Sequence, residues 1–279
     1  MNLYYKCSDG TVFDLMDGDI TCESPETLVK RKWKYKTVSA VNGFNRIKQF
    51  YKESEELPLK ISVLADTEAE FNELMMRLSL CFDKDIQTLK PGRIYWNGWY
   101  REVFCIISEP SNFEDYLASV DQKLTLFCLY DYWIKEKKTI FSSDISTEFN
   151  LNADYPYEFG DFEYMPTDYI NALDSDSVTE SHFELIFFGP CSNPYVIIGD
   201  NDYRLKNCQL ADGEYIVINS KNRTIQKHLT SGENENVFYL RNDNDIFRKL
   251  PAGKSIVTKS ADTEIQITNY IERGEPIWI

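Results

Sequence analysis

The stretch that decides the fold reads LADGEYIVINSKNRTIQK and occupies residues 210–227. Tyr215, Val217 and Asn219 alternate with Ile216 and Ile218. A polar turn follows at residues 219–222, and β-type residues resume at 224–226. A period-two strand, a turn that tolerates positive φ and a second strand together predict a β-hairpin.

Turn signals continue on both sides of this hairpin. Residues 183–188 form an apolar run that ends at Gly189, residues 193–198 open with Asn-Pro, and Pro251-Ala-Gly253 leads into a further β-rich run. Turns about every 8–12 residues between short β-rich runs are typical of a sandwich. The sequence therefore predicts a β-sandwich over residues 182–279.

The N-terminal half predicts strands packed on one helix. Strands are expected at residues 33–38 and 59–64, and Thr67 with Glu70 forms a capping box that opens a helix over residues 67–82. The apolar residues that follow share one helix face: Phe71, Leu74, Met75, Leu78 and Phe82. Asn97-Gly98 between aromatic residues predicts a tight hairpin, because a type I′ turn needs positive φ at both central residues.

These patterns divide the chain, which is long enough for two domains. We predict a mainly-β protein whose α+β N-terminal domain, residues 1–137, is sandwich-like and carries the one packed helix. An acidic connector with the first strands of the second domain is expected at 138–181, and the second sandwich at 182–279. The sequence leaves open whether the end of the chain returns to the first domain.

Composition limits the function. Forty-five acidic against 30 basic residues give a net charge of −15. A negative surface repels the phosphate backbone of nucleic acids, so ordinary nucleic-acid binding is not expected. The charge suits either solubility or the wall of a channel along which DNA slides without adhering. Seven cysteines without C-x-x-C spacing predict a reduced compartment and no metal site. No signal peptide and no run of about 18 apolar residues is present, so synthesis in a cytoplasm without membrane insertion is expected.

The order of these turn signals resembles the distal tail protein (Dit) family of long-tailed phages. The matching front segments are residues 91–100 (PGRIYWNGWY) and 124–132 (LTLFCLYDY). The matching C-terminal signals are Gly189, Asn193-Pro194, Ile197-Ile198-Gly199, Tyr203, Leu210, Gly213-Glu214-Tyr215, Ile218, Ile225, Gly232, Phe238, Leu250-Pro251, Gly253, Glu272-Arg273, Pro276 and Trp278. The resemblance covers residues 30–135 and 182–279, and the connector at 142–181 has no counterpart.

The resemblance implies a structural protein of the virion tail. Family members form a hexameric ring at the distal end of the tail tube through their N-terminal domains, and a galectin-like sandwich points outward. Such a ring joins the tube protein to the tail-tip hub and in some phages to receptor-binding proteins, while DNA passes through its lumen. Trp96, Trp99 and Tyr100 are candidate interface residues, with ordinary core or hairpin packing as the alternative.

The sequence gives less support to a catalytic or metal-binding site than to a structural role. The only histidines, His182 and His228, lie at strand ends, and the motifs of metalloproteases, serine hydrolases and phosphate loops are missing. A glycosidase needs only two carboxylates, but no pair stands out. Carboxylates at 161, 163 and 168, or at Asp200 and Asp202, could bind calcium but lack the spacing of an ordered loop. We therefore predict neither enzymatic activity nor a cofactor.

Saccharide binding is the alternative function. A galectin-like sandwich could attach a phage to host saccharides, and galectins stack the sugar on a tryptophan beside polar side chains. The outer half of this chain offers only Trp278 and no matching polar cluster. A shared fold does not carry an activity with it, so adhesion ranks second.

Overall fold

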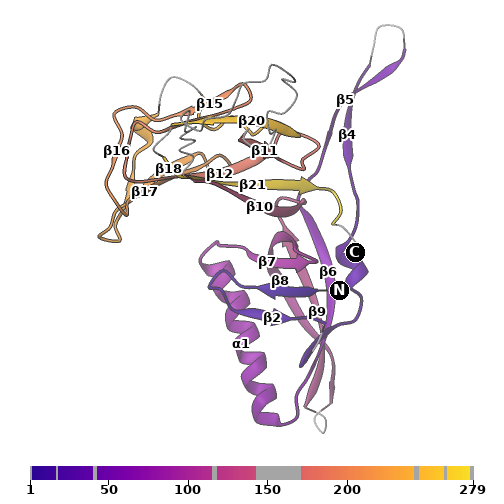
Figure 1. Ribbon diagram of the computed structural model, residues 1–279. Coiled ribbons are helices and arrows are strands. Elements are labelled where there is room, and N and C mark those ends of the chain that lie inside the picture. The colour runs from indigo at the N-terminus through magenta and orange to yellow at the C-terminus, as the bar shows by residue number, and fades with distance from the viewer. Residues whose placement is uncertain are drawn as a thin grey trace, which may run out of the picture. The chain divides into compact units, whose positions relative to one another are not determined.

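The computed structural model describes residues 2–16, 18–39, 43–114, 118–142, 171–241, 245–260 and 263–276, with the side chains of 113 and 114 excepted. The chain forms two units (Figure 1). Unit 1 holds Met1–Lys135 and Glu272–Ile279, and unit 2 holds Glu136–Ile271. Antiparallel strands dominate both units, so the predicted mainly-β class is confirmed.

Unit 1 is built on a continuous antiparallel ladder. Its strands pair in the order β2-β1-β7-β8-β9-β6-β3. The long strand β8 pairs with β7 through its first residues and with β9 through the rest, so it joins the two halves of the ladder. The strands are β1 (Leu3–Lys6), β2 (Val12–Asp14), β3 (Ile20–Cys22), β6 (Glu55–Leu64), β7 (Gly92–Trp96), β8 (Trp99–Glu114) and β9 (Ser119–Cys128), and a 3₁₀ turn spans Pro25–Leu28.

One helix, α1 (Glu68–Gln87), packs against β8. Thr67 caps the helix and Glu70 is its partner, as predicted. The Thr67 hydroxyl accepts a hydrogen bond from the Glu70 amide at 3.2 Å and donates one to the Glu70 carboxylate at 2.9 Å. The helix continues five residues beyond the predicted end at Phe82 and stops before Leu89, whose φ is +53°. The extra turn is held by Asp85, a buried carboxylate that an apolar pattern cannot reveal.

The hairpin β7–β8 forms at the predicted Asn-Gly turn. Asn97 and Gly98 have φ of +47° and +80°, and Trp96 pairs with Trp99 across the turn. Two positive φ values at adjacent positions are the requirement of a type I′ turn. The local sequence alone therefore fixes this register.

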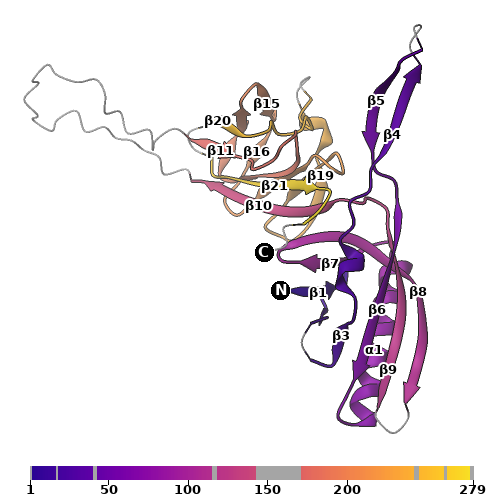
Figure 2. The same ribbon diagram turned by 90° about the vertical axis from the view of Figure 1, so that its right-hand side faces the viewer.

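A second hairpin of unit 1 is separate from the ladder. Its strands, β4 (Lys34–Ser39) and β5 (Asn45–Tyr51), pair only with each other. Figures 1 and 2 both show them projecting from one end of the unit, away from α1 at the other end. We call residues 34–51 the arm. The strand predicted at 33–38 thus exists, but outside the domain core.

Unit 2 is a sandwich of two antiparallel sheets. One sheet has the order β19-β18-β17-β12-β21 and the other β11-β20-β14-β15. The sequence hairpin of residues 210–227 becomes β17–β18, with Tyr215 opposite His228. The strands are β11 (Ala172–Asp174), β12 (His182–Phe188), β14 (Tyr195–Ile198), β15 (Asn201–Arg204), β17 (Tyr215–Asn219), β18 (Thr224–His228), β19 (Asn234–Asn236), β20 (Lys254–Lys259) and β21 (Ile265–Arg273), beside the short pair β13 (Cys191–Ser192) and β16 (Gln209–Leu210) and a 3₁₀ turn at Phe238–Leu240.

The inward side chains of both sheets form one hydrophobic cluster. Phe183 and Phe187 of β12 and Ile216 of β17 meet Val196 of β14 and Tyr203 of β15, all buried. This common core accounts for the period-two pattern in the sequence. β10 (Trp133–Phe141) carries the chain from unit 1 into unit 2, and β21 carries it back, so that Glu272–Ile279 belong to unit 1.

One pair of cysteines departs from expectation. Cys7, just after β1, and Cys81 in α1 form a disulfide with a Cα–Cα distance of 6.0 Å. The cysteine pattern predicted a reduced compartment and contained no sign of this pair. Neither an odd cysteine count nor local spacing reports on two residues 74 positions apart that the fold brings together. Among the described residues, no helix has both the length and the apolar character that crossing a membrane requires.

Candidate assembly interface

The arm is exposed on both faces although it carries large apolar side chains. Tyr35, Ile47 and Phe50 are 64%, 59% and 55% exposed. Two strands bonded only to each other are marginally stable in water without a further layer. The exposed rings therefore make the arm a candidate surface for packing against another molecule.

The register divides the side chains of the arm between two faces. Residues directly opposite each other share a face, so Tyr35 and Phe50 lie together with ring centroids 6.5 Å apart. The paired members of this neutral face are Tyr35, Thr37, Ser39, Asn45, Ile47 and Phe50, while Lys48 falls at the register shift between Lys36 and Thr37 and is assigned to neither face. The opposite, basic face carries Lys34, Lys36 and Arg46 together with Val38, Gln49 and Tyr51.

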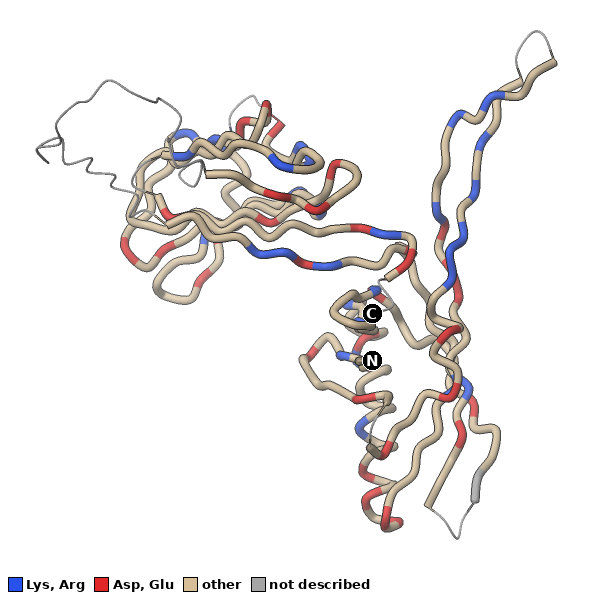
Figure 3. Tube along the Cα trace, turned by 45° about the vertical axis from the view of Figure 1, so that its right-hand side comes forward, with Lys and Arg blue, Asp and Glu red and all other residues tan. Residues whose placement is uncertain are grey.

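The arm is also segregated by charge. Residues 30–52 hold eight of the 30 lysines and arginines and none of the 45 acidic residues. Figure 3 shows the arm as a tube with blue basic positions and no red acidic ones. Among the described residues, the ion pairs of this run lie at its root: Lys32 with Glu55 at 3.2 Å, Lys34 with Glu53, and Lys52 with Asp131 at 2.9 Å. The overall charge of −15 conceals this run, and the sequence reasoning above missed it for that reason.

A buried ionic cluster fixes the root of the arm. The Lys52 ammonium donates to the Asp131 carboxylate at 2.9 Å and to the Asp131 carbonyl at 2.6 Å. The Arg101 guanidinium lies 3.1 Å from the other carboxylate oxygen. All three side chains are 2% exposed or less. Burial lowers the pKa of Arg101, but a guanidinium stays charged in proteins. The Asp131 carboxylate thus lies between two buried basic side chains.

Aromatic rings surround this cluster. Lys52 lies 5.6 Å from the ring centre of Trp33 and 5.2 Å from that of Tyr132, and Arg101 lies 4.6 Å from that of Trp133. The hydroxyl of Tyr130 donates to Glu272 at 2.8 Å, which joins the returning C-terminal segment to the same region of unit 1. The arm therefore leaves a rigid base rather than a loose loop.

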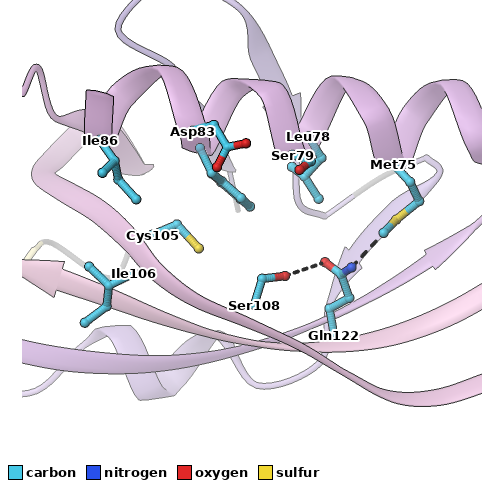
Figure 4. Close-up of a pocket in the computed structure, with 10 residues that line it drawn as sticks. Met75, Leu78, Ser79, Asp83, Ile86, Cys105, Ile106, Ser108 and Gln122 are labelled. Carbon is cyan, nitrogen blue, oxygen red and sulfur yellow. Dashed lines mark hydrogen bonds between the residues drawn. The ribbon is translucent and has the colours of Figure 1, made fainter. Parts of the chain in front are cut away.

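An open groove of about 260 Å³ lies elsewhere in unit 1, between α1 and the strands β8 and β9. Figure 4 shows Met75, Ser79 and Ile86 of the helix facing Ile106 and Gln122 of the strands. Ile86 and Ile106 are 39% and 43% exposed, so the mouth of the groove is apolar. Beside it, Met76 and Leu80 form a further exposed apolar row on the outer face of α1.

Trp96, Trp99 and Tyr100 lie inside unit 1. They are 2–3% exposed and pack in the β7–β8 hairpin. Arg93 covers Tyr100 with 4.2 Å to the ring centre, and Arg273 covers Trp99 with 5.2 Å. These contacts correspond to the hairpin-packing alternative, and a role of the three residues at an interface stays a prediction.

The histidines take part in sheet packing. The His182 ring lies 3.2 Å from the Ser220 hydroxyl, and burial lowers the pKa of His182 to about 4, so it is neutral at pH 7. His228 stacks on Tyr215 with 4.4 Å between ring centres. Asp202 lies in β15 beside Arg204, while the carboxylates at 161, 163 and 168, like Trp278, lie outside the described residues.

One cluster of possible metal ligands exists among the residues that the structure describes. It consists of Cys7, Cys81 and Asp85. The two sulfurs are bonded to each other, and the carboxylate accepts hydrogen bonds from the Tyr5 hydroxyl at 2.8 Å and the Ser8 amide at 2.9 Å. Because its sulfur and carboxylate atoms are already bonded in this way, the cluster serves to connect β1 to α1.

Solved structures share this fold over nearly the whole chain. A chain of the phage P2 baseplate in its activated conformation, solved with Ca and again with Sr, matches with a TM-score of 0.66 at 15% identity, covering 99% of this chain and 99–100% of the other. The Dit protein of phage SPP1, described as a paradigm of the hub adsorption apparatus in phages that infect Gram-positive bacteria, matches with a TM-score of 0.57 at 9% identity, covering 96% and 99%. No family model and no curated protein matches the chain. The chain has the fold of phage baseplate hub proteins of the Dit kind, as its sequence resemblance predicted.

Proposed function

We propose that this protein is a structural component of a phage tail, which assembles as a ring of six copies at the distal end of the tail tube. The ring connects the tube to the tail tip or baseplate, and DNA passes through its lumen. The observation that carries the proposal is the likeness of fold from end to end to baseplate and hub proteins. The exposed arm supports self-assembly, because none of the described residues of the chain forms a covering layer on its apolar face.

The protein acts without catalysis in this proposal. Its histidines are engaged in sheet packing, and its buried carboxylates Asp85 and Asp131 are engaged in hydrogen bonds and ion pairs. Groups fixed in this way are poor candidates for proton transfer, which needs a group poised beside a substrate. Tube protein, tail-tip hub and receptor-binding proteins are the partners that we propose, in the virion and without a membrane.

Negative-stain electron microscopy of the purified full chain tests the ring. We expect closed rings of one size with a central opening. Isolated particles of monomer size at every concentration up to about 100 μM would contradict the proposal, because obligate interfaces that bury on the order of 2,000 Å² persist far below that concentration.

Saccharide binding is the second candidate. Phe188, Tyr215 and His228 form a row of partly exposed rings on one sheet of unit 2, with 6.1 Å and 4.4 Å between successive ring centres. Aromatic faces of this kind can carry a sugar ring. A glycan array probed with the full chain tests this function, and binding that is lost in Tyr215→Ala would support it.

A further inference from the structure

We infer that the neutral face of the arm docks in the α1–β8 groove of a second copy of this chain. The inference rests on the proposed ring and names the two surfaces that would close it. Both lie in unit 1. The arm offers Tyr35, Ile47 and Phe50, and the groove offers Met75, Ile86 and Ile106 around a space of about 260 Å³.

The position of the two surfaces requires a second copy. The arm and α1 lie at opposite ends of unit 1 in both views (Figures 1 and 2). The buried cluster of Lys52, Asp131 and Arg101 holds the arm at its root, so it does not fold back on its own groove. Two complementary surfaces at separate places on one chain give head-to-tail contacts, which close into a ring when the rotation between copies is right.

Charge favours this pairing over contact between two arms. The arm has no acidic residue, whereas α1 has five acidic residues, Glu68, Glu70, Glu73, Asp83 and Asp85, against the two basic residues Arg77 and Lys84. Asp83 lines the groove itself. Opposite charges steer the arm of one copy toward the helix of the next, and like charges keep two arms apart.

The division of the arm into two faces argues against DNA as its partner. A single-strand binding surface stacks bases on aromatic side chains beside the cations that hold the phosphates. Here the exposed rings Tyr35 and Phe50 lie on the face opposite Lys34, Lys36 and Arg46, and the Tyr51 ring on the basic face is covered by Lys36 at 5.2 Å. An apolar neutral face fits a protein groove better than a nucleic acid.

Site-specific photo-crosslinking of the full-length chain tests the inference. A benzophenone amino acid replaces Phe50 on the neutral face, and the same group at Gln49 on the basic face is the control. After irradiation of the assembled protein, we expect the group at position 50 to link to a second copy at residues 75–86 or 105–108. The control should give several-fold less of that product.

Separate outcomes distinguish the inference from the proposed function. Rings whose position-50 crosslinks map elsewhere overturn the docking and leave the ring intact. A chain that never assembles refutes both. Crosslinking of position 50 to added duplex DNA, competing with assembly, would assign the arm to DNA and overturn the inference.

A groove variant gives an independent measure. Ile106 is partly exposed, so Ile106→Lys should leave the fold intact by circular dichroism while blocking the groove. We expect the concentration at half-assembly to rise by about tenfold or more. The matched control is Ile140→Lys, at an exposed position of unit 2, which should leave assembly unchanged. Equal behaviour of the two variants would overturn the inference.

Discussion

Two hairpins of unit 1 are both rich in aromatic residues, and the structure uses them in opposite ways. β7–β8 buries Trp96, Trp99 and Tyr100 in the ladder, whereas the arm leaves Tyr35 and Phe50 in solvent. The first hairpin is flanked by β1 and β9, and the second has no neighbouring strand among the described residues. Aromatic content alone therefore does not show which hairpin meets a partner. Charge segregation and the lack of a covering layer among the described residues make the arm the hairpin that we propose for assembly.

The largest effect is expected at the root of the arm. Asp131→Asn leaves Lys52 and Arg101 buried without a counter-charge, so the free energy of unfolding should fall by about 3–5 kcal/mol in urea titrations. The control is Glu53→Gln, which removes the solvent-exposed pair with Lys34 and should cost less than about 1 kcal/mol. If Asp131→Asn and Glu53→Gln both lowered the free energy of unfolding by the same small amount, the cluster would not anchor the arm.

The two hairpins should respond differently to loss of an aromatic ring. Trp99→Ala removes a buried side chain and should lower the free energy of unfolding by about 3–5 kcal/mol. Phe50→Ala should change it by no more than about 0.5 kcal/mol yet weaken assembly. Denaturant melts measure the first property and analytical ultracentrifugation the second. A stability loss at Phe50 matching that at Trp99 would erase the distinction.

Salt should weaken assembly moderately. Raising the ionic strength from about 0.15 M to about 1 M shortens the screening length from about 8 Å to about 3 Å. If charge steers the arm to α1, the concentration at half-assembly should rise by about tenfold or less, an effect of at most about 1.4 kcal/mol. The double variant Lys36→Gln with Arg46→Gln should show a smaller salt response. Assembly that strengthens with salt would point to an interface without charge attraction.

The smallest contrast concerns the two turns. Gly98 has φ +80° with open space around it, so Gly98→Ala should cost about 1 kcal/mol from backbone conformation alone. Gly43 has a similar φ of +77° near the tip of the arm. Gly43→Ala should leave global unfolding unchanged, because the arm opens locally without the ladder. Hydrogen exchange of the Gly98→Ala and Gly43→Ala variants measures both local opening and global unfolding. A lower free energy of global unfolding in Gly43→Ala would show that the arm folds cooperatively with the rest of unit 1.

Local sequence was sufficient where neighbours in the chain decide the structure. The Asn97-Gly98 turn, the Thr67 cap and the hairpin at 210–227 follow from residues within a few positions of one another. Contacts between distant residues were out of reach. The disulfide Cys7–Cys81 and the pairing of Lys52 with Asp131 join positions 74 and 79 apart. The basic run at 30–52 was visible in the sequence, and a windowed charge profile would have found it.

Native mass spectrometry of the full chain beside the triple variant Tyr35→Ser, Ile47→Ser and Phe50→Ser tests the central claim most directly. These side chains are exposed, so both proteins should give the same circular dichroism spectrum. We predict a single oligomer, six copies in the proposed ring, for the full chain and monomers for the variant. An unchanged oligomer in the variant, or a full chain that remains monomeric, would contradict assembly through the arm.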